Sequence, residues 1–107
     1  MNRKIADAWL QSFIEKDLTK LELAEDFVHT SPFGEIRGRT AYLDIVRANE
    51  EAFFSQAIGI IDVFDGGDKF VYRYRVGEMD ACDCVYVRNG RIAEVFSYYH
   101  FGEKPVM

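Results

Sequence analysis

The first stretch of the chain carries apolar residues at helical spacing. Ile5, Trp9 and Phe13 recur every four residues, and Leu10 and Ile14 widen the stripe, whereas the opposite side is polar. Apolar residues repeated three and four positions apart are typical of an amphipathic helix that buries one face. The pattern therefore predicts a helix over residues 3–16.

Two more helices are predicted before residue 55. Asp17 suits the N-cap of a short helix that ends near residue 25, because its carboxylate can accept hydrogen bonds from the first turn. Tyr42, Val46 and Phe53 share one face of a predicted helix over residues 39–53. Between the two helices we expect a strand at residues 27–31 and a loop from Pro32 to Gly38.

After residue 55 the apolar period changes to two, which is typical of strands. Strands are predicted at residues 56–64, 69–78, 82–88 and 92–101. Asp65-Gly66-Gly67-Asp68 and Asn89-Gly90 suit hairpin turns, because their residues tolerate positive φ. The predicted fold is α+β, with three N-terminal helices packed on one face of a curved, mainly antiparallel sheet.

Composition limits the kinds of protein to consider. The 107 residues are 49% apolar, which fits a single domain over residues 1–107. The net charge of −5, with basic residues scattered among acids, argues against nucleic acid as a partner. We expect no membrane span and no signal peptide, because polar residues interrupt each apolar run, and therefore a cytoplasmic location.

The cysteines and nearby acids give no sign of a metal or cofactor. Cys82 and Cys84 lie two positions apart in a predicted strand, a poor geometry for a disulfide, and structural zinc needs four ligands. Asp80 and Asp83, beside them, are expected to be solvated at a strand turn. We expect reduced thiols, no metal and no cofactor.

Several short motifs resemble one known superfamily. They are Asp17-Leu18, Leu23-Ala24-Glu25-Asp26-Phe27, Ser31-Pro32-Phe33-Gly34 with Gly38-Arg39, Asn89-Gly90, and Phe101-Gly102-Glu103-Lys104. With them the chain resembles the nuclear transport factor 2-like superfamily and its SnoaL-like domains, which are related to polyketide cyclases and steroid Δ-isomerases. The resemblance implies a cystatin-like cone around one pocket, and dimers are common in such families.

The sequence departs from the steroid isomerases at three positions. Ser31 stands where those enzymes have a catalytic aspartate before the proline turn, Trp9 where they have the tyrosine of the first helix, and Cys84 near their second carboxylic acid. A serine hydroxyl cannot move a proton at neutral pH without a neighbouring base. These departures argue against the steroid-isomerase reaction.

Strand alternation and the resemblance together predict which residues face the pocket. His29 and Tyr74 are the candidate catalytic residues, because His29 titrates near neutral pH and a phenol can stabilise an oxyanion. The alternative for His29 is a histidine held by a backbone carbonyl. Cys82 is also expected to face inward, with the candidate ligand-binding residues Trp9, Phe13, Phe27, Ser31, Phe33, Phe53, Tyr72, Cys84, Tyr86 and Tyr99.

Two functions remain open from the sequence. The first is a cofactor-independent protein that binds a small hydrophobic or aromatic molecule and isomerises, cyclises or dehydrates it. The second is a non-catalytic dimerisation or partner-binding module whose pocket is filled by its own side chains. For either, we expect a homodimer through the outer sheet face, where Phe96, Tyr98 and His100 alternate with the inward residues.

Overall fold

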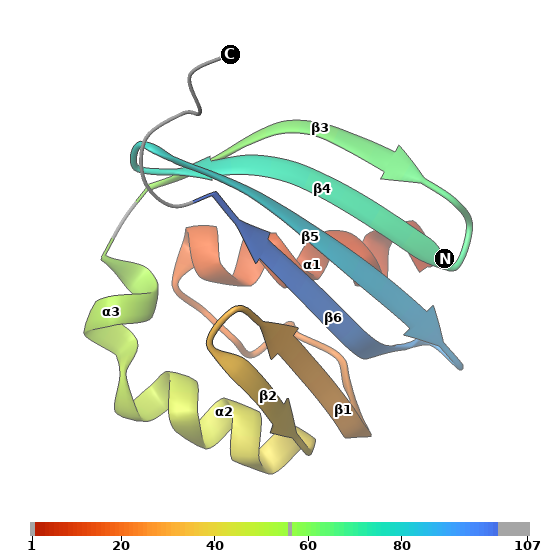
Figure 1. Cartoon of the computed structure of the whole chain (residues 1–107). Coiled ribbons are helices and arrows are strands. Elements are labelled where there is room, and N and C mark those ends of the chain that lie inside the picture. The colour runs from red at the N-terminus through yellow and green to blue at the C-terminus, as the bar shows by residue number, and fades with distance from the viewer. Residues whose placement is uncertain (1, 56, 101–107) are drawn as a thin grey trace.

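The N-terminal helix predicted by the apolar stripe is present. The structure, a computed structural model, describes residues 2–55 and 57–100, and it begins with helix α1 (Asn2–Glu15) (Figure 1). The helix buries Ala6, Trp9, Leu10 and Phe13 against the sheet. Its apolar stripe therefore forms one wall of the core.

The short helix predicted to begin at Asp17 is not formed. The Asp17 carboxylate accepts hydrogen bonds from the backbone N–H and the hydroxyl of Thr19, at 2.9 and 2.7 Å, and so holds a local turn. Strand β1 (Leu23–Ser31) then begins four residues earlier than predicted. The Asp17 side chain thus stabilises a turn instead of capping a helix.

A strand replaces the loop expected after Pro32. Strand β2 (Gly34–Arg37) pairs antiparallel with β1, and Ser31 lies opposite Gly34 across the turn. Gly34 has a φ of 129°, which other residues rarely adopt. The Ser31 hydroxyl accepts a hydrogen bond from the Phe33 backbone N–H at 3.1 Å. Ser31 is therefore a turn-stabilising residue.

The helix predicted over residues 39–53 is divided in two. Helix α2 (Arg39–Ala48) and helix α3 (Glu50–Phe54) meet at Asn49, whose φ of −129° is not helical. The Asn49 side chain donates to the Ile45 carbonyl at 2.8 Å and so satisfies the end of α2. The described part of the chain has three helices, as expected, but the second and third both arise from the range predicted as one helix.

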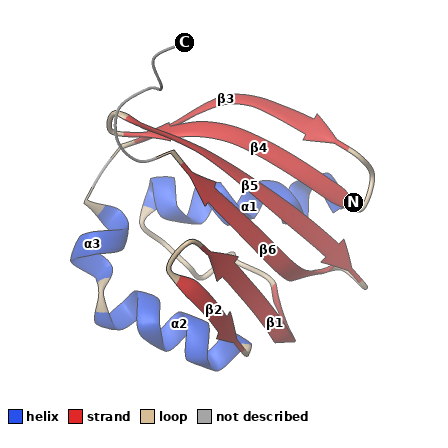
Figure 2. Cartoon of the chain, in the orientation of Figure 1, coloured by secondary structure: helices blue, strands red, loops and turns tan. Residues whose placement is uncertain are grey.

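The sheet confirms the α+β prediction. Strands β3 (Ile58–Asp65), β4 (Lys69–Val76), β5 (Met79–Arg88) and β6 (Arg91–Tyr99) form the expected antiparallel meander, while Phe101 lies outside the described residues. The strand order is β2-β1-β6-β5-β4-β3, and only the β1–β6 pair is parallel. The sheet curves, with α1 packed against β5 and β6 and α2 against β1 (Figure 2).

The predicted facing of β5 is wrong by one residue. Gly77 and Glu78 make a tight turn that places Val76 opposite Met79, so odd-numbered residues of β5 face the helices. Cys82, Cys84 and Tyr86 accordingly lie on the outer face, whereas Asp83 is buried inside. The error comes from beginning the strand at Cys82, because a strand shifted by one residue exchanges its faces.

Candidate functional site

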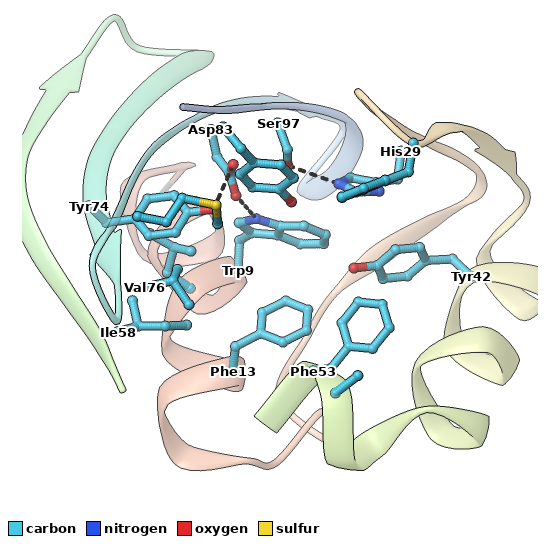
Figure 3. A pocket seen from close by; sticks show the side chains of 15 residues that line it. Trp9, Phe13, His29, Tyr42, Phe53, Ile58, Tyr74, Val76, Asp83 and Ser97 are labelled. Carbon is cyan, nitrogen blue, oxygen red and sulfur yellow. Dashed lines mark hydrogen bonds between the residues drawn. The ribbon is translucent and has the colours of Figure 1, made fainter. Parts of the chain in front are cut away.

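A cavity of about 240 Å³ lies between the helices and the curved face of the sheet (Figure 3). Most of its wall is apolar and is made by Leu10, Phe13, Phe53, Ile58, Val76 and Met79. Polar side chains gather on the sheet side, where Asp83, Ser97 and His29 lie close together. The cavity thus combines an apolar body with one polar wall.

Asp83 is the most unusual residue of this wall. Its side chain is 2% exposed, and Trp9 Nε1–H donates to its Oδ2 atom at 2.7 Å. The Tyr74 hydroxyl donates to its Oδ1 atom at 2.9 Å. One carboxyl group therefore joins helix α1 to strands β4 and β5 at the cavity.

Burial raises the pKa of the Asp83 carboxyl above its ordinary value. Hydrogen bonds from Trp9, Ser97 and Tyr74 act in the opposite direction, because they stabilise the carboxylate. Desolvation is the larger effect. A carboxyl with a raised pKa is a stronger base when ionised and keeps its proton to a higher pH, which suits a group that takes and returns a proton.

His29 is held next to this carboxyl through Ser97. Strand β6 places Ser97 directly opposite Asp83, and the Ser97 hydroxyl lies 2.9 Å from His29 Nε2. Burial lowers the pKa of His29 to about 4. The imidazole is therefore neutral at pH 7, and in this state it is a hydrogen-bonding group and a weak base.

The SnoaL-like domain family matches residues 6–95 of the chain. The chain belongs to the SnoaL-like family. No curated protein matches the sequence of this SnoaL-like protein. In the part of the chain that the structure describes, none of its helices has the length and apolar character needed to cross a membrane.

Solved structures share the fold of this SnoaL-like protein at low sequence identity. A SnoaL-like protein of unknown function from Burkholderia thailandensis has a TM-score of 0.79 and 17% identity, with 94% of each chain covered. A candidate ketosteroid isomerase from Kribbella flavida has a TM-score of 0.81 and 18% identity, covering 99% of this chain and 82% of that one. A candidate polyketide cyclase from Sinorhizobium meliloti has a TM-score of 0.76 and 20% identity, covering 88% and 93%. At such identities the likeness shows the fold alone.

The SnoaL-like fold brings some predicted site residues to the cavity and leaves others away from it. The predicted site residues that line the cavity are His29, Tyr74, Trp9, Phe13, Phe33, Phe53 and Tyr99. Phe27 and Tyr72 are buried in the core, where the Tyr72 hydroxyl donates to Asp7 at 2.7 Å. Ser31, Cys84 and Tyr86 lie outside the cavity wall for the structural reasons given above. Ligand binding by the lining residues stays a prediction.

Sequence reasoning missed Asp83 and Tyr42 in this SnoaL-like protein. Asp83 was expected to be solvated, but its position opposite Tyr72 and Ser97 turns it inward. The signal was present, because a two-residue turn at Gly77-Glu78 fixes the alternation of β5. Tyr42 was assigned to the apolar face of a helix, and nothing in that pattern indicates that its hydroxyl reaches the cavity.

The described residues can also be compared with the ligand sets that hold metal ions. Among residues 2–55 and 57–100, no three histidine, cysteine, aspartate or glutamate side chains lie together as a set that could hold a metal ion. The described side chains that can act on a bound molecule are therefore the carboxyl, the imidazole, the hydroxyls and the indole N–H of the polar wall.

Proposed function

We propose that this SnoaL-like protein binds a small apolar or aromatic molecule in the cavity and moves a proton on it with Asp83. The reaction class is cofactor-independent isomerisation, cyclisation or dehydration. The observation that carries the proposal is the buried Asp83 carboxyl on one wall of a mainly apolar cavity.

The cost of burying Asp83 supports a chemical role. An ionisable group placed in apolar surroundings destabilises the fold unless it is paired, and such groups with shifted pKa values gather at functional sites. Trp9 and Tyr74 orient both carboxylate oxygens from neutral donors, and none of the salt bridges among the described residues pairs this carboxyl with a cation. A carboxyl in this state can both accept and return a proton.

Asp83 is better suited than His29 to be the proton carrier. The pKa of His29 falls to about 4 on burial, which makes its neutral form a weak base, whereas burial strengthens the basicity of Asp83. His29 is suited instead to hold Ser97 beside the carboxyl. This revises the sequence-based hypothesis that assigned proton transfer to His29.

The proposal can be tested by deuterium exchange into acetophenone, a one-ring ketone. The Asp83 carboxylate takes a proton from the carbon beside the carbonyl, and the C–H electron pair moves toward oxygen to give an enolate. The carboxyl then exchanges with D2O and returns a deuteron to that carbon. We expect the protein to accelerate exchange over buffer, and Asp83→Asn to reduce this acceleration about 100-fold or more, as followed by proton NMR.

A matched control lies on the same strand. Asp80→Asn changes the same groups at an exposed carboxylate that pairs with Arg75, and we expect it to leave exchange unchanged. Circular dichroism melts of both variants establish that they are folded. Equal exchange rates for Asp83→Asn and the unchanged protein would show that Asp83 is not the proton carrier.

We also propose that two copies associate through the outer sheet face in a reducing, cytoplasmic location. Tyr98 is 57% exposed on this face and Phe64, at the edge strand, is also exposed. The Tyr86 and Phe96 rings pack together on the same face, 5.9 Å apart. Cys82 and Cys84 lie on the same face as free thiols, which persist in a reducing compartment. If the cavity binds nothing, this association is the alternative function.

Light scattering after size exclusion tests the association. We expect a mass of twice the 12.4 kDa chain, and a monomer for Tyr98→Arg, because a charge at the centre of an apolar contact costs several kcal/mol. Ile45→Arg, on the opposite side at helix α2, is expected to leave the mass unchanged. A monomeric mass for the unchanged protein at micromolar concentration would exclude this dimer.

A further inference from the structure

Tyr42 presents a hydroxyl to the cavity from helix α2. The residue is 1% exposed, and its ring packs against the rings of Phe27 and His29, each at 5.2 Å, and of Trp9 at 5.6 Å. Figure 3 shows the hydroxyl pointing from the helix into the open space in front of Trp9 and Phe13. The ring is therefore fixed, and the fixed ring aims its hydroxyl at the cavity.

The Tyr42 hydroxyl lacks a partner in the described part of the protein. Tyr74 and Tyr72, two other buried tyrosines, donate to Asp83 and Asp7, but the hydroxyl of Tyr42 forms no hydrogen bond with residues 2–55 and 57–100. Because Tyr42 lines the cavity, a bound molecule can supply the hydrogen bond that the described residues do not. Burial and the nearby Asp83 raise the pKa of Tyr42, so the phenol stays protonated and can donate.

The size of the cavity limits what can meet this hydroxyl. An apolar protein cavity of about 150 Å³ accommodates benzene. The cavity here, about 240 Å³, has room for one six-membered ring and a substituent of a few atoms. A fused four-ring molecule would extend beyond this volume. The apolar wall around Phe13, Phe53 and Val76 suits the ring.

We propose that the ligand is a single-ring molecule whose acceptor oxygen, of the carbonyl type, is bound by the Tyr42 hydroxyl. The inference rests on the proposed function and adds the size class of the ligand and the residue that selects its oxygen. Tyr42 is on a different helix from Trp9, which donates to Asp83, so the ligand oxygen and the proton carrier have separate partners. An oxygen on Tyr42 would orient the ring between helix α2 and Asp83.

Binding of three probes to the unchanged protein and to Tyr42→Phe tests this inference. The probes are acetophenone, ethylbenzene as its counterpart without oxygen, and androstenedione as a four-ring ketone, titrated by NMR chemical shifts. We expect acetophenone to bind the unchanged protein about 10-fold more tightly than Tyr42→Phe, and ethylbenzene to bind both equally. Androstenedione is expected not to enter the cavity. Because Tyr42→Phe keeps the ring and removes no hydrogen bond within the described residues, its unfolding midpoint should not fall.

The outcomes separate this inference from the proposed function. Equal acetophenone affinity for the two proteins would overturn the role of Tyr42 while leaving the cavity as a binding site. Tighter binding of androstenedione than of acetophenone would overturn the one-ring size class. If neither aromatic probe binds the unchanged protein, the proposed function fails together with the inference. Tyr72→Phe, a matched change at a hydroxyl that donates to Asp7 outside the cavity wall, is expected to leave every affinity unchanged.

Discussion

Trp9→Ala is expected to lower the free energy of unfolding by about 3–5 kcal/mol. Trp9 is buried, and its ring lies 5.3 to 5.8 Å from the rings of Phe13, Phe27, His29 and Tyr42. The change creates a large cavity and also leaves Asp83 Oδ2 without its Trp9 donor. Urea unfolding followed by circular dichroism measures the effect, because the chain has one tryptophan and the variant loses its fluorescence.

Trp9→Phe separates packing from hydrogen bonding. The variant keeps most of the ring but removes the Nε1–H donor, so we expect a smaller loss of about 1–3 kcal/mol. It also keeps the test informative if Trp9→Ala does not fold, since the whole stability of such a domain is about 5–15 kcal/mol. A loss below about 1 kcal/mol for Trp9→Ala would contradict the central place of this side chain in the core.

Acidification is expected to destabilise the protein through His29. The pKa of His29 is 6.5 in its ordinary state and falls to about 4 on burial, so the unfolded chain binds a proton that the folded chain excludes. The stability that neutral His29 contributes is complete above pH 6.5 and is lost as the pH falls toward 4. At about 1.4 kcal/mol for each pH unit between the two values, the loss approaches about 3 kcal/mol. Urea unfolding at several pH values measures it.

His29→Gln isolates this contribution from the other groups nearby. Asp83, Tyr42, Tyr74 and Tyr99 also line the cavity, and the raised pKa of Asp83 acts in the opposite direction, stabilising the fold as the pH falls. Glutamine keeps a polar group beside Ser97 but cannot titrate. We expect a shallower fall in stability with acid for the variant, and equal slopes in the two proteins would show that His29 is not responsible.

Local signals in the sequence were enough to predict much of the fold. The stripe from Ile5 to Ile14 identified α1, and the Asp65–Asp68 and Asn89-Gly90 turns identified two hairpins of the meander. A residue that suits two kinds of local structure gave an ambiguous prediction. Asp17 can cap a helix or hold a turn with the same carboxylate, and here it holds a turn, after which β1 begins at Leu23, a core residue.

The candidate site was harder to predict because it depends on facing and on distance between strands. The inward facing of β1, β4 and β6 was predicted with the correct alternation. Because the turn at Gly77 was missed, the alternation of β5 was predicted one residue out of step, and Asp83 was assigned to the wrong face. No periodicity shows that Trp9 and Asp83, 74 positions apart, form a hydrogen bond. Such a contact follows from the sheet order, which local patterns do not contain.

The parallel pairing of β1 with β6 determines when the cavity can be completed during synthesis. Strand β1 leaves the ribosome early, yet its neighbour β6 ends at Tyr99 and also carries Ser97. Until β6 emerges, the β1–β2 hairpin and the β3–β5 meander are two separate half-sheets with exposed edges. The polar wall is thus assembled last, in a long-range step, and until then those strand edges stay exposed to pairing with other chains.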